Sequence, residues 1–246
     1  APDHIRWHGG GLAMRLTLKN LSAWYGPAQA LWDVNIEISQ GEVVGILGRN
    51  GAGKSTLMRS IAGLQSRTGG TLHFDGVDIS ALPAHRRSLR GISLVREGGK
   101  LPGSLTVKEN LMLGSRLGLL RRKPLRAMAE VLNLFPILEP FLDRKAELLS
   151  GGQRQALALA VAFISGPELM LLDEPSAGLA PKVAQELFTT LKRLADAGNT
   201  ILVVEQHPGW LIGFAERGYL LEVGHVIAEG SIDKLLERPD TSARPN

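Results

Sequence analysis

The chain has 246 residues and 44% of them are hydrophobic, which is enough to bury a large core in one domain, or in one domain with an inserted lobe. No apolar run reaches about 18 residues, so the sequence predicts no membrane-spanning helix. The formal net charge is only +4, and the basic run at 121–123 is typical of a solvated turn, so no nucleic-acid partner is expected. The absence of cysteine suits a reducing compartment.

The first part of the chain has the pattern of strands around one helix. Residues 1–13 follow no secondary-structure pattern and resemble no export signal, so we expect a poorly ordered extension. Residues 16–39 alternate as two strands, and the hairpin signal Phe-Asp-Gly-Val at 74–77 adds to them, which predicts an antiparallel flank. The apolar run at 43–47 predicts a buried strand that leads into a helix starting near Gly53.

From about Arg96 to Ile164 the pattern changes to helices. Residues 106–109 form a capping box, Pro124 fits a first helical turn, and another helix begins at Gly151. No linker separates this stretch, so we expect a helical subdomain, residues 96–165, inserted into an α/β core of residues 14–95 and 166–246. The α/β pattern then returns, with strands at 169–173 and 200–204, a helix at 181–197 and a hairpin turn at 222–225.

A glycine-rich segment follows the strand at 43–47 and has the pattern G-x-x-x-x-G-K-S. Glycines leave room for backbone N–H groups to surround phosphates, and the following helix directs its positive end toward them. Lys54 is placed to bridge the β- and γ-phosphate oxygens, and the hydroxyl of Ser55 to bind Mg²⁺. The segment therefore predicts a nucleoside triphosphate site formed by Gly48, Arg49, Asn50, Gly51, Ala52, Gly53, Lys54, Ser55 and Thr56.

Two acidic residues, Asp173 and Glu174, end the apolar strand at 169–173. In open α/β sheets, ligands bind at the carboxyl ends of such strands. Asp173 is placed to hold Mg²⁺, and Glu174 to act as the general base on an attacking water. Earlier in the chain, residues 149–153 read Leu-Ser-Gly-Gly-Gln.

In this order, the phosphate loop, residues 149–153 and the acidic strand end resemble the ATPases of ATP-binding cassette (ABC) transporters over about residues 16–237. The resemblance implies a P-loop NTPase core of α/β class, with an antiparallel β flank and an inserted helical subdomain that contacts transmembrane subunits. It also implies that two cassettes, identical or paralogous, pair head to tail. Each ATP would then lie between the phosphate loop of one cassette and the signature, residues 149–153, of the other.

The signature residues suit a phosphate held on a partner cassette. Ser150 and the two glycines precede an apolar helix, whose free N–H groups and dipole favour an anion. An ordinary helix cap would explain Ser150, but not the glycines or Gln153. We therefore expect the γ-phosphate of the partner's nucleotide to be bound by Ser150, Gly151, Gly152 and Gln153.

Position in the motif order assigns three further residues by resemblance. Tyr25 stands where the family stacks an aromatic ring on adenine, and Glu97 stands where most cassettes have a glutamine that contacts Mg²⁺ and water. Gln206 occupies the position that usually holds the histidine switch for the γ-phosphate. Because successive side chains of an extended segment point to opposite faces, His207 is expected to point away, and a shift of one residue would exchange the two.

The resemblance also implies a function. Residues 175–181 and 204–206 are similar to the branched-chain amino acid importer group, which implies an ATP hydrolase that is peripheral on the cytoplasmic face of the cell membrane. The implied partners are permease subunits and, indirectly, an extracytoplasmic solute-binding protein for such amino acids or a related small polar or organic-acid solute. An ATPase for lipopolysaccharide export or iron–sulfur scaffold assembly would share the core motifs and is the alternative. A DNA-repair cassette is disfavoured, because the gap from Ser55 to Ser150 has no room for long coiled coils.

Overall fold

The structure, a computed structural model, describes residues 13–121 and 126–238. Residues 1–12 of the expected N-terminal extension, and Pro124 with its expected place in a helical turn, lie outside the described residues. Among the helices of the described parts, none is long and apolar enough to cross a bilayer.

The N-terminal strands form the antiparallel flank that the sequence predicts. They are β1 (Met14–Tyr25), β2 (Ala28–Ser39), β4 (Arg67–Phe74) and β5 (Val77–Asp78), in the order β2-β1-β4-β5. β1 pairs with β2 on one side and with β4 on the other. Phe74 lies opposite Val77, as the hairpin signal at 74–77 predicts.

A second sheet of six strands contains the strand of the phosphate loop. Its order is β10-β9-β3-β8-β7-β6, with β3 (Val43–Leu47), β6 (Ile92–Val95), β7 (Leu169–Asp173), β8 (Ile201–Val204), β9 (Arg217–Glu222) and β10 (His225–Ser231). All neighbouring pairs are parallel except β9 with β10. The carboxyl ends of β3, β7 and β8 therefore lie along one edge of the sheet.

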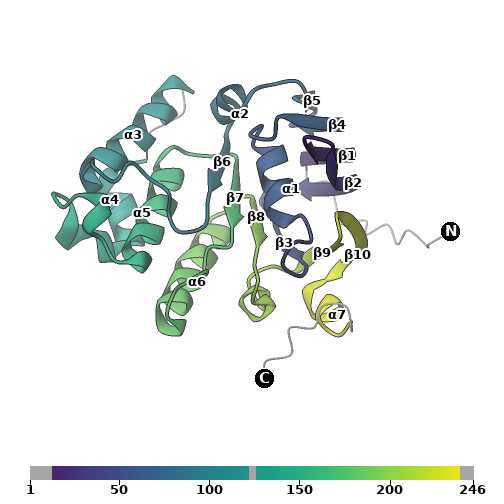
Figure 1. Ribbon diagram of the computed structural model, residues 1–246. Helices are drawn as coiled ribbons and strands as arrows, with labels where there is room; N and C mark the ends of the chain where they lie inside the picture. Colours follow the sequence, from purple (N-terminus) through teal and green to yellow (C-terminus); the bar gives the residue numbers. More distant parts are fainter. Residues whose placement is uncertain (1–12, 122–125, 239–246) are drawn as a thin grey trace.

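Helices occupy the connections between these strands. α1 (Lys54–Ile61) follows β3, α2 (Ala84–Arg90) precedes β6, α6 (Pro181–Asp196) joins β7 to β8, and α7 (Ile232–Leu236) follows β10. The stretch between β6 and β7 contains α3 (Val107–Leu120), α4 (Met128–Leu134) and α5 (Gly151–Ile164), with 3-10 turns at Pro136–Phe141 and Ala146–Leu148. A further 3-10 turn, Pro208–Leu211, follows β8. Figure 1 shows α3, α4 and α5 together at the end of the molecule away from β1 and β2.

Alternating side chains of the central strands build two cores. Leu169 and Leu171 of β7 pack with α1 and the antiparallel sheet, whereas Met170 and Leu172 pack in the core that contains α5 and α6. β8 shows the same alternation. Because both faces of these strands are covered, their sequences are continuous apolar runs rather than alternating ones.

The predicted capping box at the start of α3 is confirmed. The Thr106 hydroxyl accepts a hydrogen bond from the Glu109 amide (3.1 Å), and the Glu109 carboxylate accepts one from the Thr106 amide (2.7 Å). Each bond satisfies a donor that the first turn of a helix leaves without a partner.

Arg87 of α2 holds the C-terminal end of α1. Its buried guanidinium donates to the carbonyl oxygens of Ser60 (2.7 Å) and Ile61 (3.0 Å), and also to those of Leu82 and Ser80 (2.8 Å each). One side chain thus joins α1 to the segment before α2. The helix that begins at the phosphate loop is therefore anchored at its far end.

Replacing Arg87 by leucine tests this anchor. We expect Arg87→Leu to lower the free energy of unfolding by about 3 kcal/mol, because it leaves several buried carbonyl groups without a donor. Urea-induced unfolding measures the loss. The exposed neighbour Arg86 provides the control, since Arg86→Leu is expected to change the stability by no more than about 0.5 kcal/mol. Equal unfolding midpoints for the two variants would show that Arg87 anchors nothing.

Candidate functional site

The phosphate loop connects β3 to α1 and is packed tightly from outside. Gly53, directly before α1, has a φ of 104°, and a Cβ there would lie 2.9 Å from Leu31 Cδ2 and 3.1 Å from the Ala30 oxygen. The β9–β10 turn fixes the same loop, because the Gly224 amide donates to the Ala52 oxygen (2.9 Å). Only glycine fits at position 53, and the loop conformation is set by neighbours distant in the sequence.

Lys54 lies under this loop and is only 4% exposed. Its Nζ donates to the carbonyl oxygens of Gly48 (2.7 Å) and Arg49 (3.1 Å), and it lies 4.0 Å from Glu174 Oε1. Burial lowers the pKa of Lys54, and the carboxylates of Glu174, Asp173 and Glu205 oppose that shift. The amine is thus held where a phosphate above the loop could reach it.

Ser55 and Asp173, two of the three residues expected at Mg²⁺, lie in contact. Ser55 Oγ donates to Asp173 Oδ1 over 3.0 Å. Burial raises the pKa of Asp173, which the hydrogen bond from Ser55 opposes. Among the described residues no group of three His, Cys, Asp or Glu side chains could hold a metal. A hydroxyl beside one carboxylate fits Mg²⁺, which keeps waters and binds substrate phosphates rather than an all-protein cage.

Glu174 has a left-handed backbone, with a φ of 50°, directly after β7. Its amide donates to the Val204 oxygen (3.0 Å), and its Oε2 accepts from Gln206 Nε2 (2.6 Å). Burial raises the pKa of Glu174, against the opposing effects of Lys54 and Gln206. A buried carboxyl with a raised pKa next to a buried lysine has the properties expected of a general base.

The structure brings Gln206 into this group, at a position that strand periodicity does not describe. β8 ends at Val204, so the rule that successive side chains of a strand alternate does not extend to Gln206 and His207. Gln206 contacts Glu174, yet both Gln206 and His207 line one pocket together with Glu97. Among the described residues, no side-chain hydrogen bond joins His207 to Glu174, so its expected orientation stays a prediction.

Sequence analysis missed one buried acid, Glu205, which is 2% exposed. Its carboxylate accepts from the amide of Ser176 (2.9 Å) and from Ser176 Oγ (2.7 Å). Burial raises the pKa of Glu205 from 4.5 to about 7, although these hydrogen bonds oppose the shift. An acid directly after the apolar strand 201–204 was the only sequence signal that could have identified it.

Glu97 and Tyr25 lie at the exposed edges of the site. Glu97 follows β6, and its charge raises the pKa of both Asp173 and Glu174, which places it beside the expected metal ligands. Tyr25 is 49% exposed, and its hydroxyl lies 3.3 Å from Thr56 Oγ1 of α1. The ring is therefore open to solvent while its hydroxyl contacts the helix that follows the phosphate loop.

The signature residues lie at the start of α5. Among the described residues, no hydrogen bond or ion pair joins Ser150, Gly151, Gly152 or Gln153 to the phosphate loop. The expectation that helix capping does not explain Gln153 is wrong, because Gln153 Oε1 accepts from the Ser150 amide (2.9 Å) and completes a capping box. Packing explains Gly152, where a Cβ would lie 2.5 Å from Val183 Cγ1. Because these contacts are local, they do not test whether the four residues bind a ligand, and that role stays a prediction.

Comparisons with known proteins match this arrangement. The family described as ABC transporter matches residues 31–177. The high-affinity branched-chain amino acid transport ATP-binding protein BraG of Pseudomonas aeruginosa is 38% identical over 91% of this chain and 96% of its own. The probable branched-chain amino acid transport ATP-binding protein LivF of Archaeoglobus fulgidus is 36% identical over 88% of this chain and 92% of its own. The lipopolysaccharide export system ATP-binding protein LptB of Escherichia coli K12 is 34% identical, over 90% and 92%.

Solved structures show the same fold. A nucleotide-free ATP-binding cassette from an ABC transporter is 29% identical and superposes with a TM-score of 0.77, covering 93% of this chain and 97% of its own. A dimeric cassette in a post-hydrolysis state, bound to ADP and Pi, has a TM-score of 0.77 at 28% identity, covering 88% and 98%.

The chain therefore belongs to the ABC transporter ATPase family, and the predicted α/β P-loop fold is confirmed. It is an ATP-binding and ATP-hydrolysing subunit whose activity is coupled to transport.

The buried carboxyl of Glu205 makes the stability of the protein depend on pH. Between pH 4.5, its usual pKa, and about 7, its pKa in the folded protein, the folded state binds more protons than the unfolded chain. The stability contributed by this group therefore falls as the pH rises through that window. Because glutamine does not titrate, we expect the melting temperature of Glu205→Gln, relative to the unchanged protein, to be higher at about pH 8 than at about pH 5. Thermal scans at both pH values measure this, and an equal difference at the two would contradict it.

Proposed function

We propose that this chain powers an importer by hydrolysing ATP, and that the transported solute is a branched-chain amino acid or a related small polar or organic acid. The catalytic part is supported by one observation above all: the Glu174 carboxylate accepts from Gln206 and lies 4.0 Å from the Lys54 amine. A carboxyl so placed is suited to position water and take its proton as water attacks the γ-phosphate.

Each neighbouring residue then has a distinct task. Lys54 and the amides of the phosphate loop bind the β- and γ-phosphate oxygens, and Gln206 orients Glu174 through the 2.6 Å hydrogen bond. Ser55 and Asp173, with Glu97 beside them, would hold Mg²⁺, which would supply charge neutralisation at the phosphate oxygens. Tyr25 stacks on the adenine while its hydroxyl stays close to Thr56.

A second copy or a paralogous cassette completes the site. The dimeric solved structure of a related cassette supports this, as does the position of the signature at the amino end of α5, where Ser150 and Gly151 are exposed. In the proposed dimer, Ser150, Gly151, Gly152 and Gln153 bind the γ-phosphate of the nucleotide on the partner.

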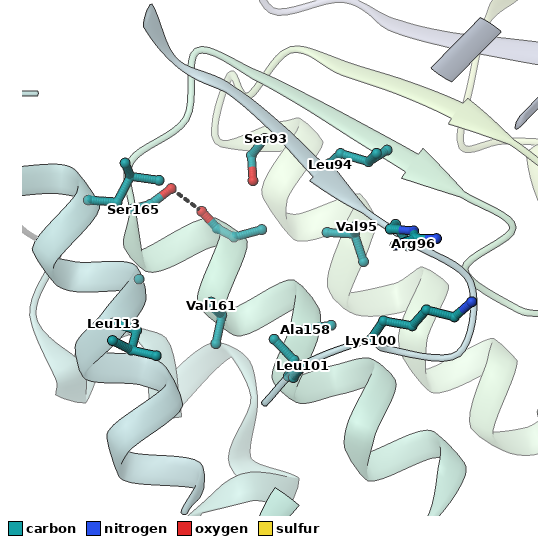
Figure 2. Close-up of a pocket in the computed structure, with 13 residues that line it drawn as sticks. Ser93, Leu94, Val95, Arg96, Lys100, Leu101, Leu113, Ala158, Val161 and Ser165 are labelled. Atoms are coloured by element: carbon teal, nitrogen blue, oxygen red, sulfur yellow. Dashed lines mark hydrogen bonds between the residues drawn. The ribbon is translucent and has the colours of Figure 1, made fainter. Parts of the chain in front are cut away.

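The proposed site for the permease subunits is the groove in Figure 2. It lies between β6, the loop after it, α3 and α5, where Val95, Leu101, Leu113 and Val161 provide an apolar lining. Arg96 and Lys100 lie at one end of it. The groove is bordered both by the helices α3 and α5 and by the loop after β6, which carries Glu97. A permease segment bound in the groove would therefore contact the loop that lies beside the proposed catalytic carboxyls. On this proposal the chain is peripheral on the cytoplasmic face, and a solute-binding protein acts only through the permease.

The similar proteins include subunits named for import and for export, so an export ATPase is the second candidate function. BraG and LivF are named for branched-chain amino acid transport, and LptB for lipopolysaccharide export, at similar identity. Residues 175–181 and 204–206 favour the importer group. We expect the chain, isolated from membranes of its own cell, to copurify with permease subunits whose neighbouring genes encode a solute-binding protein. Copurification with lipopolysaccharide-export components instead would refute the importer.

Replacing Glu174 by glutamine tests the general base. We expect Glu174→Gln to bind ATP but to hydrolyse it at least about 100-fold more slowly, because the amide cannot accept the proton. Lys54→Ala should lose nucleotide affinity instead. Phosphate release and binding of a fluorescent ATP analogue measure the two effects, with Glu186→Gln on the exposed face of α6 as the control. A near-normal rate in Glu174→Gln would rule out the assignment.

Substitutions at Gln206 and His207 test which of the two residues acts in ATP hydrolysis. We expect Gln206→Ala to impair the rate, because it removes the hydrogen bond to Glu174, and Gln206→His to be tolerated. His207→Ala should be nearly silent. Steady-state ATPase rates of the three variants decide the question, and the reverse pattern would identify His207 as the switch.

A further inference from the structure

Two side-chain bridges join the loop after β7 to the residues after β8. The first is the hydrogen bond from Gln206 to Glu174. The second runs in the opposite direction, since Glu205 accepts from both the amide and the hydroxyl of Ser176. Ser176 and Glu205 are 5% and 2% exposed, so this second bridge is sealed from solvent. Glu205 and Gln206 are adjacent, and Glu174 and Ser176 are two residues apart.

The backbone between the bridges is held in an unfavourable conformation. Glu174 has a φ of 50°, and a left-handed residue with a side chain costs on the order of 1–2 kcal/mol. Its amide is fixed before the turn by Val204, and Ser176 is fixed after it by Glu205. A backbone bond from the Ala177 amide to the Glu174 oxygen (3.1 Å) closes the turn itself. Without the second fixed point, the turn would be free to shift away from the end of β8 and carry the Glu174 carboxylate with it.

The following loop is held in part by Leu179, which packs against the core and whose amide donates to the Ser176 oxygen (3.1 Å). Residues 176–179 and 205–207 line the same pocket of about 440 Å³, together with Trp210. Gly178 and Ala180 are exposed. The two bonds to Glu205 are therefore the side-chain contacts that keep Ser176 against the end of β8.

We propose that Glu205 is a positioning residue for ATP hydrolysis: by binding both donors of Ser176, it holds the turn that keeps the Glu174 carboxylate between Lys54 and Gln206. A carboxylate is suited to this task because its two oxygens accept one N–H and one O–H at the same time. The inference rests on the proposed role of Glu174 as the general base. It assigns to Glu205 no contact with substrate.

The test compares kcat for ATP hydrolysis with the Kd of a fluorescent ATP analogue in the full chain. For Glu205→Ala we expect kcat to fall about 10- to 100-fold, because a displacement near 1 Å of a catalytic group has effects of that order. The Kd should stay within about threefold, since the phosphate loop is untouched. Glu205→Gln should keep kcat within about threefold, because its Oε1 accepts from the Ser176 amide while its Nε2 donates to Ser176 Oγ.

A matched control separates positioning from stability. Glu42 likewise accepts from a serine amide, that of Ser39 (2.8 Å), and from a distant side chain, Arg217, with which it forms an ion pair (2.7 Å), but it precedes β3 at the opposite edge of the sheet. Glu42→Ala should lower the melting temperature and leave kcat unchanged below it. A fall in kcat for Glu42→Ala equal to that of Glu205→Ala would show a merely structural effect and overturn the proposal.

Two further outcomes would also overturn it: a folded Glu205→Ala with normal kcat, and a Glu205→Gln as slow as Glu205→Ala. If Glu205→Ala does not fold, Ser176→Ala, which removes only the 2.7 Å bond, carries the test. It should lower kcat about threefold or more at unchanged Kd, and a normal kcat would refute the proposal.

Glu174→Gln, measured alongside, distinguishes a failure of this proposal from a failure of the proposed general base. A normal rate there refutes the role of Glu174, whereas a slow Glu174→Gln with a normal Glu205→Ala refutes only the role of Glu205.

Discussion

The parallel pairing of β3, β8 and β7 decides where the reactive groups of this protein lie. Ile46 is level with Val204, and Val204 is level with Asp173, so the three strands end at the same edge of the sheet. Lys54 follows the first strand, Glu174 the third, and Gln206 the middle one. A shift of one residue in any of them would exchange the side chains facing the two cores, so the apolar packing on both faces holds the site in register.

The same arrangement concentrates negative charge. Asp173, Glu174 and Glu205 are buried around a single buried amine, that of Lys54, and burial raises the pKa of all three acids. Glu97 adds a further negative charge at the exposed side. This balance gives a physical reason for the proposed use of Mg²⁺, because phosphate oxygens would otherwise meet these carboxylates with Lys54 and the exposed Arg96 as the cations that offset them.

Several motif residues are also needed for the local fold. Gln153 completes a capping box at α5, and Gly152 is in close contact with Val183 of α6. Gly53 is confined by Ala30 and Leu31 of β2. Loss of activity on substitution at these positions would therefore combine effects on folding with effects on the ligand, which is why the experiments above rely on residues whose two roles can be separated.

The sequence by itself determined the antiparallel flank, the helical stretch between two α/β parts, the phosphate loop and the acidic end of β7, because each of these is recorded in local spacing or in an apolar run, and the order of the motifs indicated the fold class by resemblance. It also determined the capping box at Thr106, which needs only four neighbouring residues. Only the tertiary structure decided that Gln206 meets Glu174, that His207 shares its pocket, and that Glu205 is buried against Ser176. These contacts join residues about 30 positions apart, beyond the end of β8 where strand periodicity no longer applies, so they depend on how separate strand ends come together.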